Sequence, residues 1–337
     1  KCSAYSVVNC IGFNSPEWLI ANTGAILASC ITAGIYATNT PEACRYISAH
    51  SKAQVVVCDG NAQLEKYAEI ARDLPHLKCV VVWGEEVDPL LAQRCGVAVY
   101  PWAAFLLLGT EAGVTDDQLE SRQRLARPGN CSTLIYTSGT TGPPKAVMVS
   151  HDNVTWTTAV LADNYLHLDC EDRLISYLPL SHIAAQLIDV HVPMYIGGCT
   201  YFAQPDCMKG SLTKSMQDVR PTFFFGVPRV WEKIQEKLVA LGRESTGLKK
   251  ALGSWAKGLA LDKAQRAQHG AAGGQSPCYG CANTVVLSKI HSALGLGSCK
   301  ACFTGAAPIS ADTLWYFSSL GLPIYEVRSA CRMCSAS

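Results

Sequence analysis

The N-terminal part of the chain alternates short apolar segments with longer segments that carry helix-start signals. The apolar segments are rich in Val, Ile and Cys and have the length of buried strands; they are Ser6–Gly12, Ile31–Tyr36, Gln54–Cys58 and Cys79–Trp83. Helices are predicted between them, over Pro16–Ala28, Pro41–Ser51 and Ala62–Asp73. The first two begin with Pro directly after a hydroxylated residue, Ser15 or Thr40, that can cap the helix. Strands that are joined by helices form parallel sheets with helices on both faces, so the alternation predicts an α/β fold.

One uncharged stretch, Trp18–Ala37, has the length of a transmembrane helix. Polar residues and glycines interrupt it, among them Asn22 and Gly24, and Ile31–Tyr36 has the composition of a strand. We therefore expect a buried helix followed by a buried strand rather than a membrane span.

Composition excludes several classes of protein. The chain has 337 residues, a length typical of about two domains, and 49% of them are apolar, which allows a large core. The 28 Lys and Arg balance the 27 Asp and Glu, which argues against nucleic acid as a partner and against a strongly basic membrane-binding surface. The chain shows no N-terminal signal-peptide pattern, and its 17 Cys are scattered. We therefore expect these cysteines to be small buried hydrophobic residues of a cytosolic protein rather than a disulfide framework. The chain begins at Lys1 on the approach to a strand, and we expect its front to be incomplete.

The loop Tyr136–Lys145 carries the strongest chemical signal. It reads Tyr-Thr-Ser-Gly-Thr-Thr-Gly-Pro-Pro-Lys and lies between two strand-like segments. Glycine lets the backbone approach a ligand closely, hydroxyl and N–H groups donate hydrogen bonds, and the ammonium adds positive charge, so the loop suits a polyphosphate. It is not a Walker A loop, because Pro144 precedes the lysine and Ala146 follows it. A polar hairpin with a Pro-Pro turn is the alternative.

These residues resemble the phosphate-binding signature of the adenylate-forming (AMP-binding) superfamily, which includes acyl-CoA synthetases, luciferases and peptide-synthetase adenylation domains. Further motifs of that superfamily follow in order: His151–Asn153, Tyr177–His182, Gly226–Ile234 and Thr304–Pro308. The opening segments Gly12–Trp18 and Gly34–Asn39 are similar to the bubblegum-type long-chain fatty acyl-CoA synthetases. The resemblance extends from about Val7 to Val327.

The resemblance implies the N-terminal domain of an adenylate-forming enzyme, with mixed and parallel sheets flanked by helices. It implies a long-chain fatty acid–CoA ligase that uses ATP, Mg²⁺ and coenzyme A. The fatty acid carboxylate attacks the α-phosphorus of ATP to give acyl-adenylate and pyrophosphate, and the thiol then displaces AMP. An anion approaches an anion in the first step, so the site must neutralise charge and hold the groups in line.

Site residues follow from the same resemblance. The residues expected around the β- and γ-phosphates are Thr137, Ser138, Gly139, Thr140, Thr141 and Gly142. Lys145 would offset charge on the departing pyrophosphate, and His182 would stand near the acyl carboxylate. The adenine would lie against Gly305, Ala306, Ala307 and Pro308, although a plain strand-to-helix turn would also explain that motif.

The acyl chain is expected beside a short aromatic strand. By resemblance, Phe225 and Gly226 would form part of a tunnel wall, where the small glycine leaves room for an alkyl chain. Trp231 resembles the gate of the fatty-acid tunnel, and a plain core aromatic at helical spacing with Ile234 explains it equally well.

The resemblance stops after Val327, and the tail 328–337 departs from the family pattern. We therefore expect a first α/β subdomain over 1–110, incomplete at its start, a linker over 111–130, an ATP- and acyl-binding subdomain over 131–327, incomplete at its end, and an aberrant tail over 328–337. The family's C-terminal domain is expected to be absent, and the chain is expected to be inactive or weakly active.

Other functions stay open at this point. The chain could be an enzyme that adenylates an aryl or amino acid, or a non-catalytic isoform that binds a partner or a lipid. Cys278, Cys281, Cys299 and Cys302 have the spacing of a four-thiolate zinc site, although Cys302 falls on an expected strand. We expect a cytoplasmic protein whose lipid substrate allows peripheral contact with the endoplasmic reticulum or another membrane; the sequence does not indicate an oligomeric state.

Overall fold

The computed structural model describes residues 2–137, 143–268 and 278–327. The chain divides into two compact units: unit 1 is Lys1–Cys170 with Ser176–Pro205, and unit 2 is Glu171–Ile175 with Asp206–Ser337. These limits differ from the predicted boundaries at residues 110 and 131. The reason is strand pairing, since β6 (Cys131–Thr137) lies beside β2 (Ile31–Ile35) in one sheet of unit 1.

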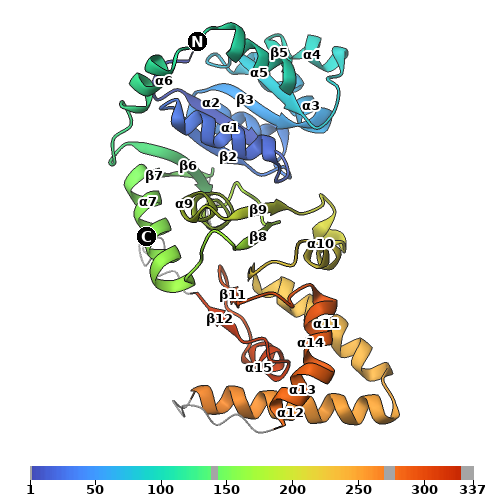
Figure 1. Cartoon of the computed structure of the whole chain (residues 1–337). Helices are drawn as coiled ribbons and strands as arrows, with labels where there is room; N and C mark the ends of the chain where they lie inside the picture. The colour runs from blue at the N-terminus through green and yellow to red at the C-terminus, as the bar shows by residue number, and fades with distance from the viewer. Residues whose placement is uncertain (1, 138–142, 269–277, 328–337) are drawn as a thin grey trace. The chain divides into compact units, whose positions relative to one another are not determined.

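Unit 1 is built on a seven-stranded sheet with the order β5-β4-β3-β1-β2-β6-β7 (Figure 1). Its other strands are β1 (Val7–Ile11), β3 (Ala53–Asp59), β4 (Cys79–Trp83), β5 (Ala98–Pro101) and β7 (Lys145–Ser150). All neighbouring pairs are parallel except β6 and β7, which form an antiparallel hairpin. The mixed α/β fold predicted from the sequence is therefore confirmed.

The strands of this sheet are buried on both faces, because successive side chains point to opposite sides. On β1, Val7 and Ile11 belong to one core cluster, whereas Val8 and Cys10 belong to the other. The first cluster is covered by α2 (Pro41–Ser51), α3 (Gly60–Ile70) and α4 (Pro89–Cys95). The second is covered by α1 (Pro16–Leu27) and by the segment around Leu180–Val190.

The predicted caps are present. Ser15 Oγ accepts a hydrogen bond from the Trp18 N–H at 3.2 Å, and Thr40 Oγ1 accepts one from the Ala43 N–H at 3.3 Å. Trp18–Ala37, the uncharged stretch, forms α1 and β2 as predicted. Among the helices that the structure describes, none combines the length and the apolar composition needed to cross a bilayer.

The predicted linker over 111–130 contains helix instead. α5 (Trp102–Glu111) leads into α6 (Asp116–Gln123), where Thr115 and Gln118 form a reciprocal capping box. Arg122 then ties this region to the C-terminal end of α1, since its guanidinium donates to the Ala28 carbonyl at 2.8 and 3.1 Å.

The rest of unit 1 is mostly helical. It contains α7 (His151–Val160), the π-helical η2 (Leu161–Leu166), α8 (Ile183–Gln186), the π-helical η3 (Leu187–His191) and α9 (Val192–Ile196). The last three follow one another without a break, so Ile183–Ile196 is one helical run with a π-helical turn in its middle. β8 (Arg173–Ser176) and β9 (Cys199–Phe202) form a two-stranded sheet. The boundary between the two units falls within β8, after Ile175.

Unit 2 has a three-stranded parallel sheet of β10 (Phe223–Gly226), β11 (Ala301–Thr304) and β12 (Ile324–Glu326), with β11 in the centre. Its helices are η4 (Cys207–Lys209), α10 (Leu212–Val219), α11 (Pro228–Glu244), α12 (Gly247–Gln268), α13 (Tyr279–Ala282), the π-helical η5 (Asn283–Leu287), α14 (Ser288–Leu294) and α15 (Ala311–Ser319). Residues 269–277, which follow α12, and the tail 328–337 lie outside the described residues.

Candidate functional site

The phosphate-loop prediction falls on the β6–β7 hairpin of unit 1. Thr137, at the end of β6, is paired with Lys145, at the start of β7, and both side chains are exposed. Within the described residues, Lys145 has no ion-pair partner. The predicted residues Ser138, Gly139, Thr140, Thr141 and Gly142 lie outside the described part of the chain. The hairpin thus presents an ammonium group and a hydroxyl at the two ends of the glycine-rich loop.

His182 lies at the N-terminus of α8, on a different segment of unit 1. Its Nδ1 accepts a hydrogen bond from the Ala184 N–H at 3.2 Å, which places the proton of the neutral ring on Nε2. Desolvation lowers the pKa of His182 below its usual value, although part of the ring is exposed. A neutral imidazole with an Nε2–H donor can give a hydrogen bond to a carboxylate without carrying a charge.

Two residues that the sequence analysis did not assign hold the segment before His182. Asn14 is buried, and its Nδ2 donates to Ser176 Oγ at 2.8 Å and to the Leu178 carbonyl at 2.7 Å, while its Oδ1 accepts from the Leu180 N–H at 3.1 Å. Gly34 on β2 lies so close that a Cβ there would stand 2.6 Å from Ser181 Cα. Both belong to the opening segments Gly12–Trp18 and Gly34–Asn39, so their motif was visible but their role was not.

In unit 2, Trp231 is fully enclosed. Its side chain is 0% exposed, and its ring packs edge-on against Phe224 at 5.2 Å and Phe317 at 5.0 Å between centroids. The indole N–H donates to the Phe303 carbonyl at 3.2 Å. The structure therefore shows the core-aromatic arrangement at this position, and a gate role for Trp231 stays a prediction.

The space beside Gly226 is occupied by the Trp231 indole. A Cβ at Gly226 would stand 2.7 Å from Trp231 Nε1, so the glycine makes room for this ring in the structure rather than for an alkyl chain. Phe225, its neighbour, lies against the next strand, where a Cβ at Gly305 would stand 3.2 Å from its ring. The structure thus brings together the predicted acyl-wall residues and the first residue of the predicted adenine turn.

The adenine turn itself has an unusual backbone. Ala306 has φ +70°, a left-handed conformation that costs an L-residue roughly 1–2 kcal/mol. Gly305 is buried, whereas Ala306, Ala307 and Pro308 are exposed. Strained, exposed backbone at the end of a central parallel strand is where α/β proteins place ligand contacts, and adenine binding at this turn stays a prediction.

The cysteine set does not gather into a metal site. Cys278 and Cys281 are exposed at α13, while Cys302 is buried on β11, 3.7 Å from the Cys299 sulfur. In the described ranges, no group of three or more His, Cys, Asp or Glu side chains is arranged to hold a metal ion. The strand placement of Cys302 agrees with the prediction, and the zinc alternative gains no support.

Comparison with known proteins identifies the family. The family model for AMP-binding enzymes matches residues 2–327. Long-chain-fatty-acid--CoA ligase ACSBG2 of Xenopus laevis is 45% identical over 96% of this chain, and the human protein of that name is 40% identical over 95%. Human long-chain-fatty-acid--CoA ligase ACSBG1 is 39% identical over 94%. The chain spans less than half the length of these relatives, between 43% and 47%.

Solved structures show the same fold at low sequence identity. The A-PCP didomain of carboxylic acid reductase from Segniliparus rugosus, in complex with AMP, matches with a TM-score of 0.65 at 21% identity, over 96% of this chain and 42% of that one. The anthranilate CoA ligase AuaEII, in complex with anthranoyl-AMP, matches with a TM-score of 0.65 at 18% identity, over 98% of this chain and 51% of that one. By its family match and by its relatives, the chain belongs to the AMP-binding enzymes.

Proposed function

We propose that this chain provides the ATP- and acyl-binding part of a long-chain fatty acid–CoA ligase. The reaction joins a fatty acid to AMP with release of pyrophosphate, and coenzyme A then takes the acyl group and releases AMP. The observation that carries the proposal is the extent of similarity, since ligases named for long-chain fatty acids match about 95% of the chain. The contacts of individual residues support the details.

Charge neutralisation is the main task of such a site. Lys145 suits it because its ammonium is exposed at the loop and has no ion-pair partner among the described residues. We assign Lys145 and the loop from Thr137 to Gly142 to the phosphates, and His182 Nε2–H to the carboxylate of the fatty acid. The exposed turn Ala306–Pro308 is assigned to the adenine.

We assign Mg²⁺ to the phosphates of ATP rather than to a protein site. Mg²⁺ commonly keeps several waters and is held by substrate phosphates with one or two carboxylates. The described residues contain no cluster of three or more metal ligands.

Binding and turnover test the proposal separately. The purified chain should bind a fluorescent ATP analogue, and Lys145→Ala should weaken that binding roughly ten- to hundred-fold, because a charge-assisted contact contributes about 1.5–3 kcal/mol. Lys250→Ala, which removes an exposed lysine from α12, is the matched control and should change nothing. Equal affinity of the Lys145→Ala variant and the parent chain would refute the assigned role.

The substrate class is tested by pyrophosphate release. Any release by the chain, which is expected to be weak or absent, should depend on palmitate and not on benzoate or on an amino acid. Release with benzoate or an amino acid alone would identify the chain as a different adenylating enzyme. ATP binding without release for any acid would favour the non-catalytic alternative.

A further inference from the structure

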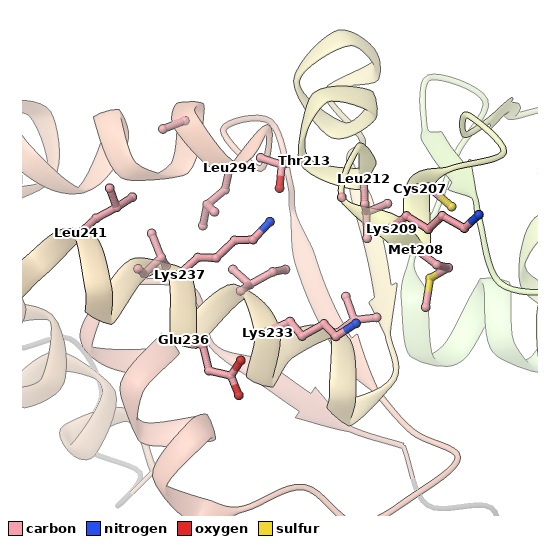
Figure 2. A pocket seen from close by; sticks show the side chains of 15 residues that line it. Cys207, Met208, Lys209, Leu212, Thr213, Lys233, Glu236, Lys237, Leu241 and Leu294 are labelled. Atoms are coloured by element: carbon pink, nitrogen blue, oxygen red, sulfur yellow. The ribbon is translucent and has the colours of Figure 1, made fainter.

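Unit 2 contains a pocket that the assigned substrate residues do not line. Its volume is about 470 Å³, within the range of small-molecule sites. It lies between η4 with α10 on one side, α11 on another, and the end of α14 (Figure 2). Trp231 and Gly226 are not among the lining residues.

The pocket borders the Trp231 cluster along α11. The apolar lining residues of this helix recur at three- and four-residue intervals, at Val230, Ile234, Leu238 and Leu241. Ile234 and Leu238 follow Trp231 by three and seven residues, so Trp231 lies next to this stripe, but its ring packs against Phe224 and Phe317. A ligand in the pocket would therefore contact the leucines of α11 and not the Trp231 ring, which is not a lining residue.

The walls of the pocket are apolar and continue to its rim. Leu212 and Leu294 face α11 from the neighbouring helices and are buried. At the rim, Leu241 is 62% exposed and Met208 is 50% exposed, although both line the same hollow. Such a surface lowers its contact with water when an alkyl chain covers it.

The charges around these walls are mostly of one sign. Three lysines line the pocket, Lys209, Lys233 and Lys237, and none of them has an ion-pair partner in the part of the chain that the structure describes. The one acidic lining residue, Glu236, forms an ion pair with Arg229, with 3.8 Å between Glu236 Oε1 and Arg229 Nη1.

Lys233 and Lys237 stand four residues apart on α11, a spacing at which like charges repel. Figure 2 shows the Lys237 side chain extending from α11 toward Thr213 and the Lys233 side chain running along α11 below Leu212, whereas Lys209 points away from both. An anion between the two ammonium groups would relieve their repulsion, and Thr213 could donate its hydroxyl proton to it.

We infer that this pocket binds a single-chain amphiphile with an anionic head, of the fatty-acyl class, at a site distinct from the substrate site. The alkyl chain covers the leucine-lined wall of α11, and the carboxylate lies between Lys233 and Lys237. A concave pocket of this volume fits one chain, which distinguishes it from a surface that lies on a bilayer. The inference does not depend on the proposed ligase activity, because binding is measured without nucleotide.

Photolabelling of the full chain tests the site directly. The probe is a long-chain fatty acid with a diazirine at the end of its chain, and labelled peptides are identified by mass spectrometry. We expect label on η4–α10 and α14, around 208–213 and 293–294, that excess palmitate removes. In the double variant Lys233→Glu/Lys237→Glu, the amount of label on these peptides should fall at least tenfold relative to the parent chain. The variant Lys233→Arg/Lys237→Arg should be labelled as strongly as the parent chain.

Two competitors define the ligand. Hexadecyltrimethylammonium has an alkyl chain of similar length with a cationic head and should not displace the probe from these peptides. Vesicles containing phosphatidylserine should displace it less well than palmitate does. The inference is overturned if these peptides carry no label, if the glutamate variant is labelled as strongly as the parent, if the cationic amphiphile competes equally, or if vesicles compete better than palmitate. Label confined to the Phe225–Gly305 region would support the ligase proposal and refute the second site. Label confined to 208–213 and 293–294 would support the second site and leave the acyl part of the ligase proposal without support.

Discussion

Asp189 should make the stability of unit 1 fall as the pH rises above neutrality. Its side chain, in η3, is 6% exposed, and burial raises the pKa of its carboxyl from 3.8 to about 8, against a smaller lowering by a hydrogen bond from Ser176. Asn14 donates to the Ser176 oxygen, which directs the hydroxyl proton toward the carboxyl. Between pH 3.8 and about 8 the folded protein therefore holds a proton that the unfolded chain has released, so a higher pH favours unfolding.

A second buried group acts in the opposite direction, but only in acid. Burial lowers the pKa of His191 from 6.5 to about 4, so its folded form stays neutral while the unfolded form gains a proton below pH 6.5. Stability from His191 is thus present above pH 6.5 and is lost as the pH falls toward 4. The Asp189 and His191 slopes offset each other below pH 6.5, and above it the Asp189 slope continues. Each pH unit there changes the free energy of unfolding by about 1.4 kcal/mol, which gives about 2 kcal/mol between pH 6.5 and 8.

The test compares urea unfolding of the parent chain and Asp189→Asn at half-unit steps from pH 6.5 to 8. Hydrogen exchange of peptides from the seven-stranded sheet assigns the transition to unit 1. Asparagine keeps the shape and an acceptor for Ser176 but does not ionise, so the variant should lose the slope. Asp163→Asn, which changes an exposed aspartate of η2, should keep it. Parallel pH profiles for the parent and Asp189→Asn would refute the reasoning.

Two glycine substitutions test the packing of unit 2. Gly295→Ala should lower the free energy of unfolding, measured by urea titration, by roughly 2–5 kcal/mol, because φ is +77° and the new Cβ would stand 2.3 Å from the Met216 carbonyl carbon. The control is Gly113→Ala, where φ is +59° but the Cβ meets open space, and it should lower that free energy by only about 1–2 kcal/mol. Gly226→Ala should cost roughly 1–3 kcal/mol by displacing the Trp231 indole, and Trp231→Phe in the same chain should remove most of that cost; additive effects in the double-mutant cycle would contradict direct contact between the two residues.

The parallel part of the fold could be predicted because its signals are local. Ser15 and Thr40 mark helix starts, and the continuous apolar runs mark strands that are buried on both faces. The helix α6 escaped prediction because it has no apolar stripe: none of its residues is buried, and its one signal is the capping box of Thr115 and Gln118. The strand order was out of reach, because pairing of β2 with β6 depends on contacts about a hundred residues apart.

The candidate site divides in the same way. Residue types that suit phosphate or a flat ring can be read from short motifs, which is why the loop ending at Lys145 and the turn at Ala306 could be proposed as sites. What surrounds a residue cannot be read so easily. Gly226 suggested room for an alkyl chain, but the indole of Trp231 takes that room, and only the three-dimensional packing of α11 on β10 and β11 decides between the two. Asn14 was hidden for the same reason, because its three partners lie more than 160 residues away.

α11 shows how one helix can serve two requirements that remain experimentally separable. Trp231 fixes the helix to the sheet through its aromatic contacts and its hydrogen bond to Phe303, so substitutions there disturb the core of unit 2. Lys233 and Lys237 are exposed, and their ammonium groups form no ion pair among the described residues, so changing them costs little folding energy. A loss of amphiphile binding in the lysine variants with an unchanged unfolding midpoint would therefore report on the pocket itself, whereas a shifted midpoint would show that the pocket is coupled to the core around Trp231.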